Sequence, residues 1–156
     1  MHWYRGNGEV IQLPLEEQLE SDLTREIAQG HRLRICIGSD SKLRKDSVDY
    51  ATALVVVREK QGAFMFLRRW TSPYPVGLRE RMMGEVSYSI ELAYALAPLA
   101  ARLKLPLEIH ADINRDPAFQ SHVAFKAAMG YILGMGFIFR SKPEAFASSS
   151  CADKAI

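Results

Sequence analysis

The order of apolar and turn-forming segments is the feature of this sequence that most constrains its fold. Five segments have the composition and length of strands, and they cover 32–38, 48–58, 63–70, 107–113 and 137–140. Helical periodicity separates the last three of them, at 78–103 and 121–133. Three hairpin-connected strands followed by two crossovers predict an α/β fold, with a mixed five-stranded sheet flanked by helices.

About 30 residues precede this pattern. A short strand or arm is expected at 8–13, and a helix at 14–29, because Pro14 suits a first helical position and Gly30 suits a C-terminal cap. A last segment at 143–156 is expected to be helical in part. A length of 156 residues suits one domain, so we expect a single domain over 1–156, with the arm and helix at about 1–30.

Composition excludes several classes of protein. Hydrophobic residues make up 48% and charged residues 24%, which is typical of a globular chain, and no apolar run reaches the roughly 18 residues of a membrane span. The polar and aromatic residues 1–8 do not resemble a signal peptide, so we expect a cytoplasmic protein with no membrane partner. Cys36 and Cys151 have no zinc-site spacing. A net charge of +2 does not by itself predict a nucleic-acid partner.

Two aspartates are expected at the ends of strands. Asp40 follows the apolar run 35–37, and Asp112 lies between Ala111 and Ile113 in the fourth strand. A carboxylate among apolar residues is costly unless it is paired or bound to a metal. The alternatives are a turn aspartate at 40 and an exposed strand end at 112.

Two further acids complete the candidate set. Glu85 falls on the apolar stripe of the long helix expected at 78–103. Pro98 lies inside this helix and should kink or break it. The alternative partner of Glu85 is a nearby arginine, Arg79 or Arg81. Asp153 is the fourth candidate, and its alternative is an exposed charge in the tail. Carboxylates from separate elements suit Mg²⁺ or Mn²⁺, and two such ions can activate a water and stabilise the leaving oxygen of a phosphodiester.

Four short motifs resemble those of the YkuK-like family of bacterial proteins, which is assigned to the RNase H-like superfamily. The motifs are Ile37-Gly38-Ser39-Asp40-Ser41, His110-Ala111-Asp112-Ile113-Asn114, Lys142-Pro143 and Ala152-Asp153-Lys154. The resemblance covers nearly the whole chain, from about residue 10. It implies a sheet of order 3-2-1-4-5, with acids from the first strand, the first long helix, the fourth strand and a C-terminal helix. By that resemblance Asp40, Glu85, Asp112 and Asp153 are the matching positions.

The resemblance and the acids together predict a metal-dependent hydrolase, a nuclease that cuts nucleic-acid phosphodiesters with two ions of Mg²⁺ or Mn²⁺. RNA, DNA and hybrid substrates stay open, as does the oligomeric state. Candidate substrate-binding residues are Lys42, His110, Arg140 and Lys142. A satisfied core histidine is the alternative for His110, and neutralisation of an acid is the alternative for Arg140. The rival functions are a binding module of the same fold without catalysis and, less favoured, one lobe of an actin-like phosphotransferase.

Overall fold

The elements of the protein form one mixed sheet with helices on both of its faces. The computed structural model describes residues 2–113, 126, 129–130 and 132–156. The elements are β1 (Tyr4–Arg5), α1 (Leu15–Ala28), β2 (Leu33–Leu43), β3 (Val48–Arg58), β4 (Ala63–Ser72), α2 (Leu78–Arg102), β5 (Leu107–His110), β6 (Ile138–Arg140) and the π-helix η1 (Ala147–Ala152). The strand order is β1-β4-β3-β2-β5-β6, in which β5 pairs in parallel with β2 and β6 while the other pairs are antiparallel.

The α/β class and the order of the five expected strands are confirmed, but the number of strands is corrected from five to six. The expected order 3-2-1-4-5 occurs as β4-β3-β2-β5-β6, and β1 is added at the outer edge of β4. The arm expected at 8–13 contributes only a single bridge, between Val10 and Tyr4. A strand as short as Tyr4–Arg5 shows no alternation in sequence, because two residues cannot establish a period of two.

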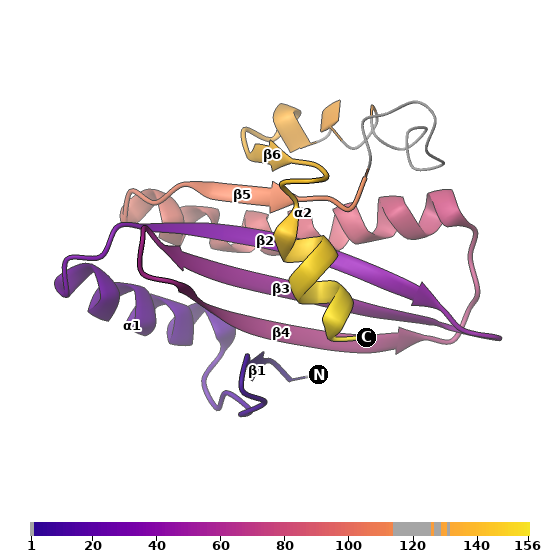
Figure 1. The fold of residues 1–156 in the computed structure, drawn as a ribbon, viewed down its shortest axis with the longest axis horizontal. Coiled ribbons are helices and arrows are strands. Elements are labelled where there is room, and N and C mark those ends of the chain that lie inside the picture. Colours follow the sequence, from indigo (N-terminus) through magenta and orange to yellow (C-terminus); the bar gives the residue numbers. More distant parts are fainter. Residues whose placement is uncertain (1, 114–125, 127–128, 131) are drawn as a thin grey trace.

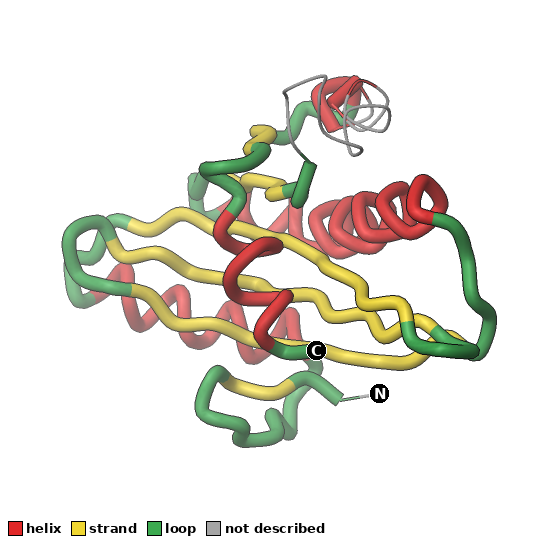
Figure 2. The backbone as a smooth tube through the Cα atoms, turned by 45° about the vertical axis from the view of Figure 1, so that its right-hand side comes forward, coloured by secondary structure: helices red, strands yellow, loops and turns green. Residues whose placement is uncertain are grey.

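The two faces of the sheet are covered differently (Figures 1 and 2). Helices α1 and α2 lie against one face, and the larger hydrophobic core, including Leu23, Ile37 and Phe66, fills the space between them and the sheet. The C-terminal helical segment, with η1, crosses the other face in front of β2 and β3. Cover on both faces explains why the middle of β2 is an unbroken apolar run instead of an alternating one.

Helix α2 continues past the proline that was expected to kink or break it. It runs from Leu78 to Arg102 with Pro98 inside. Pro98 has no amide hydrogen to donate to the carbonyl of Tyr94, four residues earlier. Both residues lie on the exposed side of the helix, where water can reach that carbonyl. Within the described part of the chain, no helix combines the length and apolar character that a membrane crossing requires.

The C-terminal segment approaches the sheet closely at one glycine. A Cβ atom on Gly38 would lie 2.3 Å from the amide nitrogen of Ser148 and 2.6 Å from the carbonyl carbon of Ala147. Ala147 packs in a second, smaller hydrophobic core that also contains two small buried residues of β3, Ala51 and Ala53. The absence of a side chain at Gly38 therefore sets how near η1 lies to β2, and with it the position of Asp153.

Two expectations fall on residues that are not described. The expected loop at 114–119 lies outside the described residues, and so does much of the helix expected at 121–133. The described residues 126, 129–130 and 132–134 of that segment are helical.

Candidate acidic site

Asp40 lies inside a strand and not at its end. The polar residues after Gly38 continue β2 as far as Leu43, paired with β3 throughout. Ser39 Oγ holds this extension, at 2.8 Å from Thr52 Oγ1 of β3 and 2.8 Å from Ser89 Oγ of α2. Hydrogen bonds thus replace apolar packing, and side-chain alternation turns Asp40 toward the face that carries the C-terminal helix.

The carboxyl of Asp40 is surrounded by other acids. Burial raises the pKa of Asp40 to about 7, and a hydrogen bond with the Asp153 side chain and the charges of Asp112 and Asp153 act in the same direction. The amide of Ser41, which donates to Asp40 Oδ1 at 2.9 Å, opposes the shift. The structure therefore brings Asp153 within hydrogen-bond reach of Asp40, while Asp153 is also exposed, as the alternative expected for it.

Glu85 approaches the site from the helix side of β2. Its side chain is 7% exposed, and the Ser41 hydroxyl donates a short hydrogen bond to Glu85 Oε1. Burial raises the pKa of Glu85 to about 8, the Ser41 hydrogen bond lowers it, and the charges of Asp40 and Asp112 raise it. Arg81, the expected alternative partner, contacts Ser41 Oγ at 3.3 Å, and the ion pairs among the described residues include none between Arg81 and Glu85.

Asp112 lies just beyond the strand next to β2, close enough for its charge to raise the pKa of Asp40. The parallel register pairs Gly38 of β2 with His110 of β5, and the Ile113 amide then donates to the Ala111 carbonyl at 2.8 Å, which makes a tight turn around Asp112. β5 itself ends at His110, earlier than expected. Asp112 Oδ1 is shielded from solvent without an aligned hydrogen bond, and it lies 2.9 Å from Lys142 Nζ, an ion pair by distance.

The four expected acids therefore gather around one stretch of β2, but from two sides. Asp40 and Asp153 meet on the face of the C-terminal helix, while Glu85 reaches Ser41 from the face of α2. The charge of Asp112 acts on both Asp40 and Glu85. Burial is the main cause of the raised pKa values, and the neighbouring carboxylates add to it. Carboxylate oxygens are the ligands that a hard divalent cation prefers, but among the described residues no three of these acids bring ligand atoms within 4.8 Å of one another.

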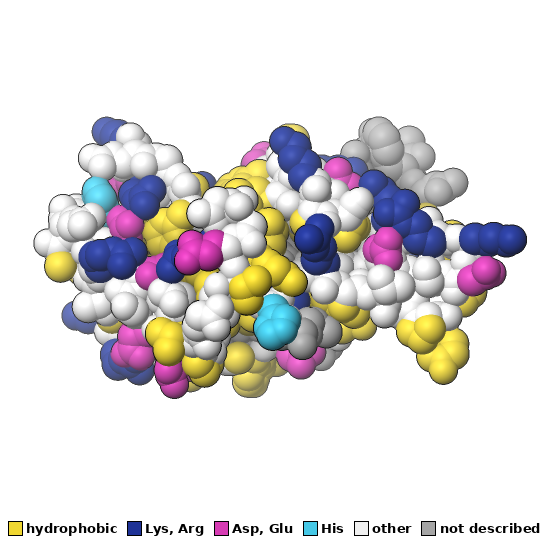
Figure 3. Space-filling view, turned by 90° about the horizontal axis from the view of Figure 1, so that it is seen from below, with side chains coloured by type: hydrophobic (Ala, Val, Ile, Leu, Met, Phe, Trp, Pro, Cys, Tyr) yellow, Lys and Arg dark blue, Asp and Glu magenta, His cyan; other side chains and the backbone are white. Residues whose placement is uncertain are grey.

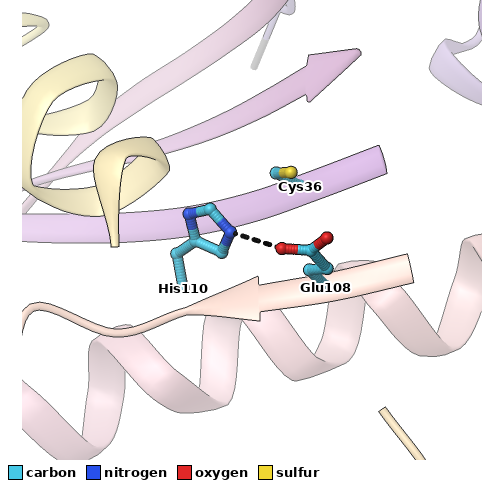
Figure 4. A group of neighbouring side chains, drawn as sticks. All are labelled: Cys36, Glu108 and His110. Carbon is cyan, nitrogen blue, oxygen red and sulfur yellow. Dashed lines mark hydrogen bonds and ion pairs between the residues drawn. The ribbon is translucent and has the colours of Figure 1, made fainter. Parts of the chain in front are cut away.

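A second group of potential ligands lies on the face of the sheet that carries Asp40 and the C-terminal helix. Among the described residues, the side chains of Cys36, Glu108 and His110 form a group of three whose ligand atoms lie within 4.8 Å of one another (Figure 4). Cys36 comes from β2 and the other two from β5. All three are buried.

The polar atoms of this group already have protein partners. Glu108 receives Arg34 Nη1 at 2.9 and 3.0 Å and His110 Nε2 at 3.1 Å, while His110 Nδ1 accepts the amide of Ala147 at 3.2 Å. Burial raises the pKa of Glu108, but the hydrogen bonds from His110 and Arg34 outweigh it and bring the pKa to about 2. Burial also raises the pKa of the Cys36 thiol to about 12, so the thiolate that a metal requires is disfavoured. We interpret the group as a buried ion-pair network that holds the start of η1.

The candidate substrate-binding residues have different surroundings. Lys42 is exposed, and His110 is fully enclosed with both ring nitrogens hydrogen-bonded. Arg140 Nε lies 3.3 Å from Glu108, and Lys142 pairs with Asp112. Arg140 thus neutralises an acid, which is the alternative that the sequence left open, while Lys142 remains 44% exposed beside the site.

Sequence reasoning missed the role of two residues in this region. Ser41 connects Glu85 to β2, and Glu108 anchors the ion-pair network. Glu108 had a visible signal, because a glutamate between Leu107 and Ile109 in a buried strand requires a partner. Ser41 had none beyond its place next to Asp40.

The sheet order and the match to a family model define the class of this protein. The chain belongs to the ribonuclease H-like family, whose model matches residues 18–156. It is also similar to the Bacillus subtilis (strain 168) protein named "Uncharacterized protein YkuK". The identity is 28% over 134 residues, and the match covers 77% of each chain. No solved structure matches the chain significantly. Membership of this family supports a nuclease or a nucleic-acid-binding module.

Proposed function

We propose that the protein is a divalent-metal-dependent nuclease that hydrolyses nucleic-acid phosphodiester bonds. The observation that carries the proposal is the cluster of acids at β2, where Asp40 hydrogen-bonds to Asp153 and the charge of Asp112 raises the pKa of Asp40. Asp40, Glu85, Asp112 and Asp153 would hold Mg²⁺ or Mn²⁺, two ions by the family resemblance. When bound, such ions lower the pKa of water and neutralise charge on a phosphodiester.

The chain's own residues would prepare the site for this chemistry. Burial of Asp40 and Glu85 excludes water and strengthens their attraction for a cation. The Ser41 hydroxyl orients one oxygen of Glu85, and Arg81 holds Ser41 in turn. Lys142 is half-exposed and paired with Asp112, and it would exchange that carboxylate for a phosphate of the substrate when cations enter the site.

The test is cleavage of labelled RNA, DNA and hybrid duplexes in Mg²⁺ or Mn²⁺. Asp40→Asn keeps the size of the side chain but removes its charge, and we expect cleavage to fall by about 100-fold or more, since loss of a group that only supports a metal ligand typically costs about 10–100-fold. Asp46→Asn, at an exposed turn, is the matched control and should cleave like the wild type. Cleavage that persists in Asp40→Asn would exclude this mechanism.

The second candidate is a nucleic-acid-binding module without catalysis. The ion pair between Lys142 and Asp112 favours it, because an ammonium group there neutralises a carboxylate without any metal. Such a module would bind nucleic acid equally well in a chelator and in Mg²⁺, and it would cleave none of the three substrates. Metal-stimulated turnover in the same assays would reject it.

A further inference from the structure

A large pocket lies at the end of the sheet where β2 begins. Its volume is about 760 Å³, within the range of roughly 300–1,000 Å³ that small-molecule sites occupy. The end of α1, the β3–β4 hairpin and the connection from α2 to β5 surround it. Leu33 in its wall and Asp40 are separated along extended β2 by roughly 23 Å, so the pocket is separate from the acidic site.

The wall of the pocket combines an aliphatic surface with an excess of positive charge. The aliphatic side chains come from Ile27, Leu33, Val57, Leu103, Leu105 and Pro106. Lys60 and Lys104 have no ion-pair partner among the described residues. Glu59 is the acidic residue of the lining, and its Oε2 lies 3.9 Å from Nη1 of Arg32. At this distance, and with the Arg32 side chain 87% exposed, the ion pair is weak. At the left-hand end of Figure 3, where β2 begins in Figure 1, Lys and Arg side chains border apolar ones.

The two lysines also share an uncommon backbone conformation. Lys60 has φ 62° and Lys104 has φ 58°, and within the described residues they are the non-glycine positions with positive φ. Lys104 follows Leu103, the C-cap of α2, and the Leu105 amide donates to the Ala100 carbonyl at 2.9 Å. Glycine usually takes this position after a helix. A side chain at such a position strains the backbone, and strained non-glycine residues concentrate at ligand sites. The side chains of Lys60 and Lys104 thus point to a role other than folding.

We propose that this pocket binds a small organic phosphate. Lys60 and Lys104, assisted by Arg32, would hold the phosphate group, and the aliphatic wall would hold an apolar or aromatic body. A ligand with an anionic and an apolar part fits the lining best, because it gives the exposed cations a counter-charge and also covers the aliphatic surface. The proposal does not depend on the nuclease proposal.

The first test uses 1-naphthyl phosphate as the probe, with 1-naphthol and inorganic phosphate as its two halves. Isothermal titration calorimetry on the full chain should detect 1-naphthyl phosphate, with each half at least about tenfold weaker. Equal binding of 1-naphthol would indicate an apolar groove only, and equal binding of inorganic phosphate a simple basic patch. Either result, or no binding of the probe at millimolar concentration, overturns the proposal.

The second test separates binding from folding. Lys60→Gly and Lys104→Gly remove the cations while glycine relieves the positive φ, so each variant should bind the probe about tenfold more weakly with an unchanged or higher melting temperature. Lys45→Ala, an exposed lysine at the β2–β3 turn, is the charge-matched control and should bind normally, as should Asp40→Asn.

Asparagine also tolerates this backbone, so Lys60→Asn and Lys104→Asn provide a second pair if a glycine variant folds poorly. Wild-type affinity in all four lysine variants, or an equal loss in Lys45→Ala, overturns the proposal.

Discussion

Asp40 and Glu85 make the metal-free protein sensitive to pH. Burial and neighbouring charges raise the pKa values of these carboxyls to about 7 and about 8. In the unfolded chain both groups titrate near 4. Between about pH 4 and pH 8 these two groups therefore bind more protons in the native state than in the unfolded state, so their contribution to stability is full below pH 4 and falls as pH rises through the native pKa values.

We expect the free energy of unfolding in a chelator to decrease by roughly 5–7 kcal/mol between pH 5 and pH 8, because the two shifts together cover about five pKa units of this range and one unit corresponds to about 1.4 kcal/mol. Urea denaturation at several pH values measures it. Glu85→Gln should make the decrease smaller, because an amide does not titrate and only the contribution of Asp40 remains. Glu91→Gln, an exposed glutamate on the same helix, should keep the wild-type slope. A stability that rises with pH, or one equally steep in Glu85→Gln, would contradict this account.

At this scale the sequence identified two buried acids, Asp40 and Glu85, but not their contacts, and it missed Glu108. Glu85 was predicted to face the core from its place on an apolar stripe, and it is 7% exposed. Periodicity reports only which side of a helix is buried. The contact of Glu85 with Ser41 also depends on the height at which α2 crosses β2, which no local pattern encodes. Whether the four carboxylates bind a metal stays a prediction.

Among the elements, β2 and the C-terminal helix together determine the geometry of the acidic site. The sequence predicted an end to the first strand at 38 because the apolar residues stop there. The strand extends to Leu43 because Ser39 finds hydroxyl partners on both β3 and α2. Such partners are far apart in sequence, which is why the extension was not predicted.

Gly38→Ala tests the contact between these two elements. The added Cβ would clash with Ser148, so we expect a loss of about 1–3 kcal/mol in unfolding free energy and a weaker affinity for Mn²⁺, because Asp153 moves away from Asp40. Gly130→Ala is the control, since a Cβ there meets nothing within 4 Å and helical alanine is favoured. Denaturation and Mn²⁺ titration of both variants would decide the point, and unchanged values in Gly38→Ala would refute it.

For the whole molecule, the sequence predicted the α/β class and the order of five strands, and it missed β1 at the edge. Order follows from the succession of hairpins and crossovers, which local patterns reveal, whereas an edge strand of two residues leaves no pattern. The organisation as one domain and the cytoplasmic location stay predictions.

Metal binding should also be visible as a change in the stability of the whole molecule. At pH 8 a concentration of Mn²⁺ about 100 times its dissociation constant adds about 2.7 kcal/mol, which corresponds to a melting temperature higher by about 5–10 °C. Asp40→Asn should lose this shift. Cys36→Ala should retain it, because we assign Cys36, Glu108 and His110 to an ion-pair network. A shift lost in Cys36→Ala and kept in Asp40→Asn would place the metal in that network instead.

The close packing of the last helix on Gly38 has a consequence for biosynthesis. Residues 40, 85 and 112 leave the ribosome before residue 153, and Asp153 can reach Asp40 only after η1 docks on the completed sheet. A nascent chain of the proposed nuclease would therefore lack its fourth carboxylate while it is still close to the messenger and ribosomal RNA that surround it. The order of synthesis would in this way delay activity until translation of the site is finished.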